Sequence, residues 1–239
     1  MILNEVKRIE AKYFIKESDL PLIIDVLSTY MVLDENCKEI RPYQLTSLYF
    51  DDVNDKDLRQ KLDGVIRRKK YRLRFYNRDF SNGKFEIKRK AGITINKSSI
   101  AVQKDDIAKI VEGEYACLFG YGCDYEVQEL FLGNYKPKSI VTYDRLAFYL
   151  PYNNIRVTLD LHLRTHGYSL SLENHLNEGI SINPKGHQII EIKYSDSIPD
   201  GILRELSKFS LSRTAISKYA SARLFSHEEN NIDLPYFAW

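Results

Sequence analysis

Charged residues at every second position make residues 70–90, KYRLRFYNRDFSNGKFEIKRK, the stretch of this chain with the clearest chemical potential. We predict two strands joined by a polar turn over residues 77–84, with Ser81-Asn82-Gly83 as the turn residues. Strand side chains alternate between two faces, so Arg72 and Arg74 share one face and the intervening apolar residues share the other. Arginine presents a rigid fork of donors that fits phosphate oxygens, so the charged face is a candidate phosphate site.

The same pairing of a charged face with an apolar face recurs in other strand-like segments. It is found at Arg8, Glu10 and Lys12, at Glu86 and Lys88, at Arg145 and Arg156 on successive strands, and at Glu191 and Lys193. In any one strand, a face exposed to water is the commoner explanation. For the whole set we favour charged faces that line an interior, because they are rich in arginine and the helical segments carry apolar stripes that need a partner surface.

An interior lined with so many cations requires anions, because an unpaired buried charge is very costly. A polyanion together with a metal ion would satisfy this requirement. The inward carboxylates Glu10, Glu86 and Glu191 would hold Mg²⁺ or Mn²⁺, which prefer hard oxygen ligands and bridge phosphates. The pattern therefore predicts an enclosed, metal-assisted phosphate site.

The elements that must position these side chains alternate between strands and helices. Besides the hairpin, we expect strands over residues 7–15, 45–50, 93–102, 139–150, 155–164 and 188–194. We expect helices from Ser18 or Asp19, within 105–133, through 202–209 and from near Thr214, and we expect the first helix to bury Leu22, Ile23, Val26, Leu27 and Tyr30. Helices that interrupt mostly antiparallel strands indicate an α+β domain built on a barrel or a strongly curved sheet. We assign one domain to residues 1–239, with a core at about 7–225 and a C-terminal tail at 226–239.

Composition narrows the class of protein. The chain has 239 residues, 44% hydrophobic content and a net charge of +2, which is ordinary for a globular domain and argues against a general nucleic-acid binder. The three cysteines, Cys37, Cys117 and Cys123, are odd in number and include no CxxC pair, which argues against a disulfide framework and a zinc site. No signal peptide or membrane-spanning run is visible, so we expect a cytoplasmic location, which leaves room for a membrane-protein partner.

A set of short motifs in fixed order resembles the VTC domain, the polyphosphate polymerase domain of the vacuolar transporter chaperone complex. The motifs are Glu10-x-Lys12-Tyr13, LYFDD ending at Asp52, YRLRFY from Tyr71, FEIK from Phe85, Tyr143-x-Arg145, Arg156-x-Thr158-Leu159-Asp160, Glu191-Ile192-Lys193 and Ser217-Lys218-Tyr219. Each motif alone is weak, but the ordered set is specific, and it covers the chain from Arg8 to about Phe225. The VTC domain belongs to the triphosphate tunnel metalloenzymes of the CYTH-like superfamily.

The resemblance implies a closed antiparallel β-barrel with helices packed outside, whose tunnel binds ATP or another triphosphate and the growing inorganic polyphosphate. The residues that match tunnel phosphate ligands are Lys12, Arg72, Arg74, Lys88, Tyr143, Arg145, Arg156 and Lys193, with Lys61 and Lys97 matched by spacing alone. Glu191 matches the metal-binding glutamate. Ser217 and Lys218 match a helix that closes on the tunnel end.

The activity implied is transfer of the γ-phosphoryl of ATP onto phosphate or polyphosphate, with Mn²⁺ or Mg²⁺ as cofactor. Arg72, Arg74, Lys193 and Lys218 are the expected catalytic residues, acting by position and charge rather than as nucleophiles. Hydrolytic members of the superfamily begin with an ExExK strand, whereas Arg8 occupies the first acidic position here, as in the polymerase branch. A triphosphatase, a non-catalytic polyphosphate or nucleotide sensor and a nucleic-acid-binding domain stay open as alternatives. The chain looks like a free-standing version without an SPX-type regulatory bundle.

Overall fold

The computed structural model describes residues 9–92, 94–151, 154–167, 169–172 and 179–228. Within these residues one sheet contains eleven strands, and its main path runs β11-β1-β10-β8-β7-β3-β4-β5-β6, with β2 paired to β7 and β9 to β8. The strands are β1 (Ile9–Lys16), β2 (Val32–Leu33), β3 (Tyr43–Asp51), β4 (Arg67–Tyr76), β5 (Asp79–Ala91), β6 (Thr94–Gln103), β7 (Lys136–Leu150), β8 (Ile155–Thr165), β9 (Ile180–Ser181), β10 (His187–Tyr194) and β11 (Ser212–Arg213). The helices are α1 (Leu20–Tyr30), α2 (Lys56–Leu62), α3 (Lys104–Glu112), α4 (Asp124–Leu132), α5 (Asp200–Leu206) and α6 (Lys218–Glu228), with 3-10 turns at Glu17–Asp19 and Ala116–Leu118.

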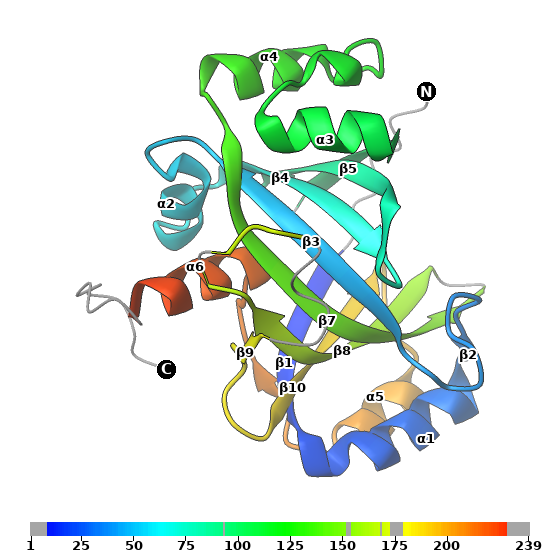
Figure 1. Cartoon of the computed structure of the whole chain (residues 1–239). Coiled ribbons are helices and arrows are strands. Elements are labelled where there is room, and N and C mark those ends of the chain that lie inside the picture. The colour runs from blue at the N-terminus through cyan, green and yellow to red at the C-terminus, as the bar shows by residue number, and fades with distance from the viewer. Residues whose placement is uncertain (1–8, 93, 152–153, 168, 173–178, 229–239) are drawn as a thin grey trace.

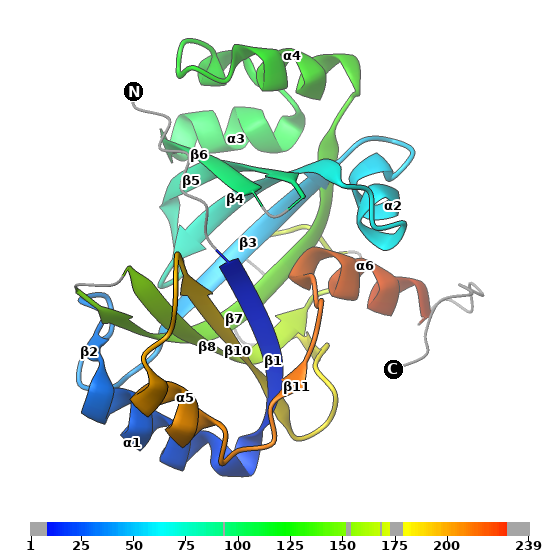
Figure 2. The same ribbon diagram turned by 180° about the vertical axis from the view of Figure 1, so that it is seen from behind.

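The sheet is strongly curved and has two arms. The long strands β3 and β7 cross the molecule and join one arm, β4-β5-β6, to the other, β8-β10-β1 (Figures 1 and 2). All pairings along this path are antiparallel, which confirms the predicted α+β class and antiparallel sheet. Among the strands that the structure describes, no ladder joins β6 to β11, so backbone hydrogen bonds do not close the predicted barrel.

Helices cover the outer face of each arm. α3 and α4 stack over the β4-β5-β6 arm, and α1 and α5 lie against the other arm (Figure 1). Under α3 and α4, a buried cluster includes Phe50, Tyr71, Phe85, Ile110 and Leu130. A second cluster, under α1 and α5, includes Ile23, Leu27, Leu159, Ile190 and Ile202. The apolar outer faces are therefore occupied, and the charged faces are left to point inward.

Some predicted details of the helices are wrong. In α1, Ile23 and Leu27 are buried, but Leu22 is 60% exposed and Tyr30 43% exposed, because only the narrow stripe that contacts the sheet is covered. Residues 105–133 form α3, a 3-10 turn and α4 instead of continuous helix; Gly113, at a φ of +92°, ends α3 in the left-handed conformation. α5 ends at Leu206, and α6 begins at Lys218 instead of near Thr214.

The turn of the central hairpin also differs from the prediction. Asn77 and Arg78 have φ angles of +50° and +64° and connect β4 to β5 directly. Two successive residues with positive φ are typical of a type I′ hairpin turn, and asparagine tolerates this conformation well. The predicted turn residues Ser81-Asn82-Gly83 instead belong to β5, where the register shifts between Arg74 and Tyr76. Arg8 and tail residues 229–239, about which the sequence also made predictions, lie outside the described residues.

Candidate functional site

Inward side chains from the two arms of the sheet meet in the space between them, here called the lumen. Glu10 on β1 lies 2.9 Å from Lys88 Nζ on β5, although β1 and β5 share no ladder. Figure 2 shows β1 lying between the two arms. On the other side of the lumen, Arg74 on β4 donates to the hydroxyl of Tyr143 on β7 at 3.3 Å. The alternation of charged residues therefore places them on enclosed faces.

Glu86 organises the first group of lumen residues. Its Oε2 accepts from Arg72 Nε at 2.7 Å and lies 3.6 Å from Arg74 Nη1, and its Oε1 contacts Lys97 Nζ. Burial raises the pKa of Glu86, but the positive charges of Arg72, Arg74 and Lys97 outweigh it and hold this pKa well below its usual range. Arg72 also donates to the hydroxyl of Tyr49 at 3.3 Å. The group fixes two guanidinium groups side by side.

Asp160 organises a second group. It is fully buried and accepts from Arg145 through both carboxylate oxygens, at 2.6 and 2.8 Å, and from Lys218 Nζ at 2.5 Å. Lys218 Nζ also lies 4.8 Å from the centre of the Tyr143 ring. Burial raises the pKa of the Tyr143 hydroxyl, but Arg145, Arg74 and Lys218 outweigh burial and lower it. A positive field at Tyr143 is what an anion site requires.

Two carboxylates lie together in a third group. Lys12 Nζ is 3.1 Å from Glu10 and 3.8 Å from Glu191, and Lys193 Nζ is 2.6 Å from Glu191. Burial and the charge of Glu191 raise the pKa of Glu10, but Lys12, Lys88 and Lys193 lower it further, to about 2. Both carboxylates are therefore ionised at neutral pH.

Lys70 is a lumen residue that sequence reasoning missed. It shares the face of Arg72 and Arg74 on β4, and its Nζ lies 2.5 Å from Ser217 Oγ at the start of α6. Burial, followed by the charges of Lys12 and other lumen cations, holds the pKa of Lys70 well below its usual range. Its parity with Arg72 was the signal that could have identified it.

Asp51 fixes the helix that carries Ser217 and Lys218. The Asp51 carboxylate is fully buried and accepts from the backbone N–H groups of Asp57 and Leu58 in α2, both at 2.9 Å. It also accepts from the hydroxyl of Tyr219 at 2.7 Å. The LYFDD motif therefore ties α2 and α6 to the end of β3, and Lys218 is held where it reaches Asp160.

The remaining predicted residues lie at the margins of the lumen. Arg156 pairs with Asp34 at 2.9 Å and its side chain is 40% exposed, so the structure does not bring it into the three groups. Lys61 on α2 has no contact with them, but burial and the charges of Arg68, Lys12 and Lys90 lower its pKa, which places it near the β4 end of the lumen. The Lys97 side chain is 45% exposed beside Glu86.

The carboxylates differ in their fit to a divalent metal. Glu10 and Glu191 face the same space on neighbouring strands and contact a common lysine, and two carboxylates completed by substrate phosphates are a usual setting for Mg²⁺. Both oxygens of Glu86 are already occupied by cations, so a metal there would have to displace one; its role as a ligand stays a prediction. Among the described residues no cluster of three His, Cys, Asp or Glu side chains could hold a metal unaided.

Solved structures with a similar fold agree with this architecture. A protein of Bacillus halodurans, described as a candidate adenylate cyclase, superposes with a TM-score of 0.53 and 13% identity, over 90% of this chain and 96% of its own. A Vibrio parahaemolyticus protein with the same description gives a TM-score of 0.46 and 13% identity, over 89% and 97% of the two chains. A Pyrococcus horikoshii protein gives 0.45 and 13%, over 92% and 99%. No curated protein matches the chain.

The fold and the cation-lined lumen define the class as a CYTH-like triphosphate tunnel domain. Within that class the family is also established, because the family model described as the VTC domain matches residues 7–227. The chain belongs to the VTC domain family. Among its described residues, no helix has the length and apolar character needed to cross a bilayer.

Proposed function

We propose that this domain is a metal-dependent phosphotransferase of the polyphosphate polymerase type, which moves the γ-phosphoryl of ATP onto phosphate or a polyphosphate chain. The observation that carries the proposal is the environment of Lys70. Its ammonium contacts a neutral serine hydroxyl at 2.5 Å, and the charges that act most strongly on it are those of Lys12, Lys88 and Lys61, all positive. A partly buried ammonium among other cations calls for an anion of several charges beside it.

The whole lumen shows the same imbalance. Among the described residues, nine lumen cations (Lys12, Lys70, Arg72, Arg74, Lys88, Lys97, Arg145, Lys193 and Lys218) face four carboxylates (Glu10, Glu86, Asp160 and Glu191). A triphosphate or a polyphosphate chain supplies several negative charges along one line and suits this arrangement better than a single phosphate. Occupation by such a chain would also complete, through side chains and ligand, the closed tunnel that the backbone leaves open.

Four side chains are proposed to act on the transferring group. Arg72 and Arg74 lie side by side through Glu86 and would hold oxygens of one phosphate. Lys193 and Lys218 approach from β10 and α6, held by Glu191 and Asp160, and would hold the next phosphate. Cations fixed in advance stabilise the charge of a phosphoryl-transfer transition state without reorganising during the reaction.

The other predicted residues take supporting roles in this proposal. Lys12, Lys88, Arg145 and Tyr143 would bind phosphates along the lumen, and Glu10 and Glu191 would hold Mg²⁺ or Mn²⁺. Such a metal bridges phosphate oxygens and offsets their charge. The attacking oxygen belongs to the acceptor phosphate, so no protein nucleophile is required. We also propose that residues 7–225 form a single domain.

The decisive experiment is incubation of the protein with ATP and Mn²⁺, followed by separation of the products on a gel. A ladder of polyphosphate is the expected result. ADP and phosphate alone would mean that water is the acceptor and that the domain is a triphosphatase. Unchanged ATP, with tripolyphosphate still bound in a separate titration, would mean a binding module. Arg74→Ala serves as the inactive reference, because it removes a lumen cation whose partner Glu86 keeps Arg72 and Lys97.

A further inference from the structure

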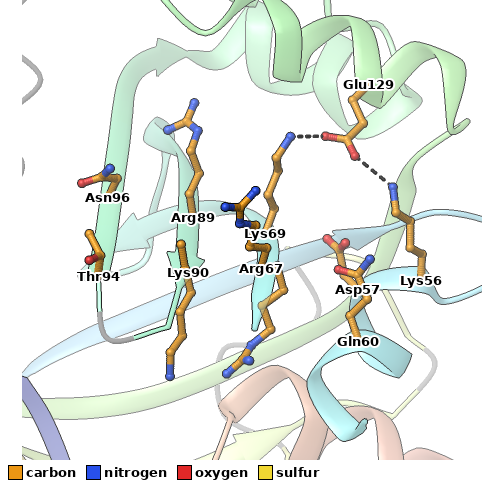
Figure 3. A pocket seen from close by; sticks show the side chains of 12 residues that line it. Lys56, Asp57, Gln60, Arg67, Lys69, Arg89, Lys90, Thr94, Asn96 and Glu129 are labelled. Carbon is orange, nitrogen blue, oxygen red and sulfur yellow. Dashed lines mark hydrogen bonds and ion pairs between the residues drawn. The ribbon is translucent and has the colours of Figure 1, made fainter. Parts of the chain in front are cut away.

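A second concentration of positive charge lies outside the lumen. A cleft of about 330 Å³ opens on the outer face of β4, β5 and β6, between α2 and α4 (Figure 3). It is lined by Arg67 and Lys69 of β4, Arg89 of β5, and Thr94 and Asn96 of β6. These positions alternate with those of Lys70, Lys88 and the other lumen residues, so they belong to the opposite face of the same strands.

The carboxylates near the cleft are already neutralised. Glu129 accepts from Lys69 at 2.7 Å, from Lys56 at 3.0 Å and from the hydroxyl of Tyr71 at 2.7 Å. The guanidinium of Arg89 is held by Glu126 at 2.6 Å, a residue of α4 behind the cleft. The net charge of the lining is therefore positive.

Two polar groups in the lining have unused capacity. The side chain of Arg67 makes no hydrogen bond or ion pair with any residue that the structure describes. Asp57 lines the cleft and is only 2% exposed, and its buried Oδ2 has no partner among the described residues. Burial, followed by the charge of Asp51, raises the pKa of Asp57 to about 8, so at neutral pH this group carries a proton and can donate it in a hydrogen bond. A guanidinium and a buried acid proton both point to an anionic ligand.

The cleft and the lumen are joined around the strand ends. Arg89 and Lys90 are consecutive on β5, and Figure 3 shows their side chains leaving the strand in opposite directions, that of Arg89 toward α4 and that of Lys90 away from it. On β4, Arg67 and Arg68 alternate in the same way. Burial and the charge of Arg68 lower the pKa of Lys90, which shows that these two rim cations lie close together. Positive side chains therefore follow a continuous path from one face of the sheet to the other.

We propose that the outer cleft binds a condensed phosphate chain that continues from the lumen around the ends of β4 and β5. This inference rests on the proposed function, because it takes the lumen to hold the first phosphates of the same chain. A short polyphosphate would fill the lumen alone, whereas a long one would reach Arg67.

The test compares tripolyphosphate with a long polyphosphate chain by calorimetric titration of the wild type, Arg67→Glu and a control. Arg67 is exposed and unpaired, so the substitution leaves the fold intact. Arg204→Glu is the matched control, because Arg204 is an exposed arginine of α5, on the opposite arm of the sheet. We expect Arg67→Glu to weaken the long chain about tenfold or more, since a charged hydrogen bond is lost and a repulsion gained, and to leave tripolyphosphate unchanged. Arg204→Glu should change neither.

Each contrary result is distinguishable. If the long chain binds Arg67→Glu within twofold of the wild type, the cleft takes no part and the proposal is wrong. If the wild type binds a second equivalent of tripolyphosphate that Arg67→Glu loses, the cleft is a separate anion site and the continuous path is wrong. If tripolyphosphate binds Arg74→Ala as tightly as the wild type, the proposed lumen function fails instead, whatever Arg67→Glu does.

Discussion

Glu10 on β1 and Lys88 on β5 form an ion pair of 2.9 Å between two strands that share no backbone ladder. Each strand lies second from an edge of the curved sheet. The pair therefore joins the two arms through side chains at the place where a barrel would join them through its backbone. It encloses the charged faces, and it makes the lumen sensitive to single substitutions and to protonation.

Arg74→Ala should abolish tripolyphosphate binding with little loss of stability. Arg74 is buried but is one of three cations around Glu86, so the carboxylate keeps Arg72 and Lys97 after the substitution. Loss of one charged hydrogen bond to the ligand, with its share of the field, should weaken binding about tenfold to a hundredfold. Calorimetric titration and thermal melting measure the two effects, with Arg204→Ala as the control. An Arg74→Ala protein that unfolds but still binds would show that the charge is structural.

Asp160→Asn should destabilise the free protein and strengthen its response to ligand. The substitution leaves Arg145 and Lys218 buried without their counter-charge, which costs about 3–5 kcal/mol in comparable sites. Tripolyphosphate should restore much of this loss, so its effect on the melting temperature should exceed that in the wild type. The control is Asp106→Asn, which removes an exposed partner of Lys109 and should cost at most about 0.5 kcal/mol. Equal ligand shifts in Asp160→Asn and wild type would contradict the prediction.

Affinity for tripolyphosphate should fall as the pH rises above 8. Burial, together with the charge of Lys12, lowers the pKa of Lys88 to about 8 against the effect of Glu10. The anion binds the protonated form, so affinity is full below this pKa and declines above it. In the free protein the sign is opposite: between about pH 8 and the usual lysine range the unfolded chain binds more protons, so stability contributed by this group rises with pH. Titrations from pH 7 to 9 test the first effect, and Lys88→Arg, which stays charged, should remove it.

Tyr219→Phe should impair turnover more than binding. The substitution removes the hydroxyl that donates to Asp51 at 2.7 Å but keeps the ring, which stacks on Tyr49. Asp51 retains its backbone donors, so the free energy of unfolding should fall by only about 1–2 kcal/mol. A looser α6 would displace Lys218, and ATP turnover should drop while tripolyphosphate affinity changes less than twofold. Denaturant melts and product gels measure these quantities. Unchanged turnover would show that this anchor does not position the lysine.

Glu191→Gln and Glu86→Gln separate two roles of carboxylates. Glu191→Gln should raise the Mn²⁺ concentration needed for half-maximal activity about tenfold or more, because one of two charged ligands is lost. Glu86→Gln should leave the Mn²⁺ requirement unchanged and alter phosphate affinity, since Glu86 holds Arg72 and Arg74. Electron paramagnetic resonance of bound Mn²⁺ checks the metal effect independently of activity. An equal effect in both variants would make Glu86 a metal ligand as well.

The strands and their charged faces could be predicted because the period of a strand is short and local. Parity alone put Arg72 and Arg74 on one face, and the apolar stripes of the helices supplied the argument that this face is enclosed. The same rule applies to Lys70, which was overlooked because it ends a basic run that reads as solvated. Once α6 packs against β7, Ser217 brings Lys70 into the lumen.

Pairing across the lumen could not be predicted, because it depends on contacts between distant segments. Arg156 has the right parity, but Asp34 reaches it from the segment after β2 and holds it at the margin. The hairpin turn failed for a local reason: Ser81-Asn82-Gly83 carries the usual turn residues, yet Asn77 and Arg78 adopt the left-handed conformation with no glycine. Closure of the sheet follows from its curvature, which no residue pattern specifies.

The Glu10–Lys88 contact also has a consequence for the solution conditions in which the domain is handled. Neighbouring strands are joined by neutral backbone hydrogen bonds, whereas the two arms meet through ionised groups. Dissolved electrolyte screens the latter and leaves the former almost untouched. Ionic strength should therefore loosen this molecule along one line, between β1 and β5, before it affects any other part of the sheet.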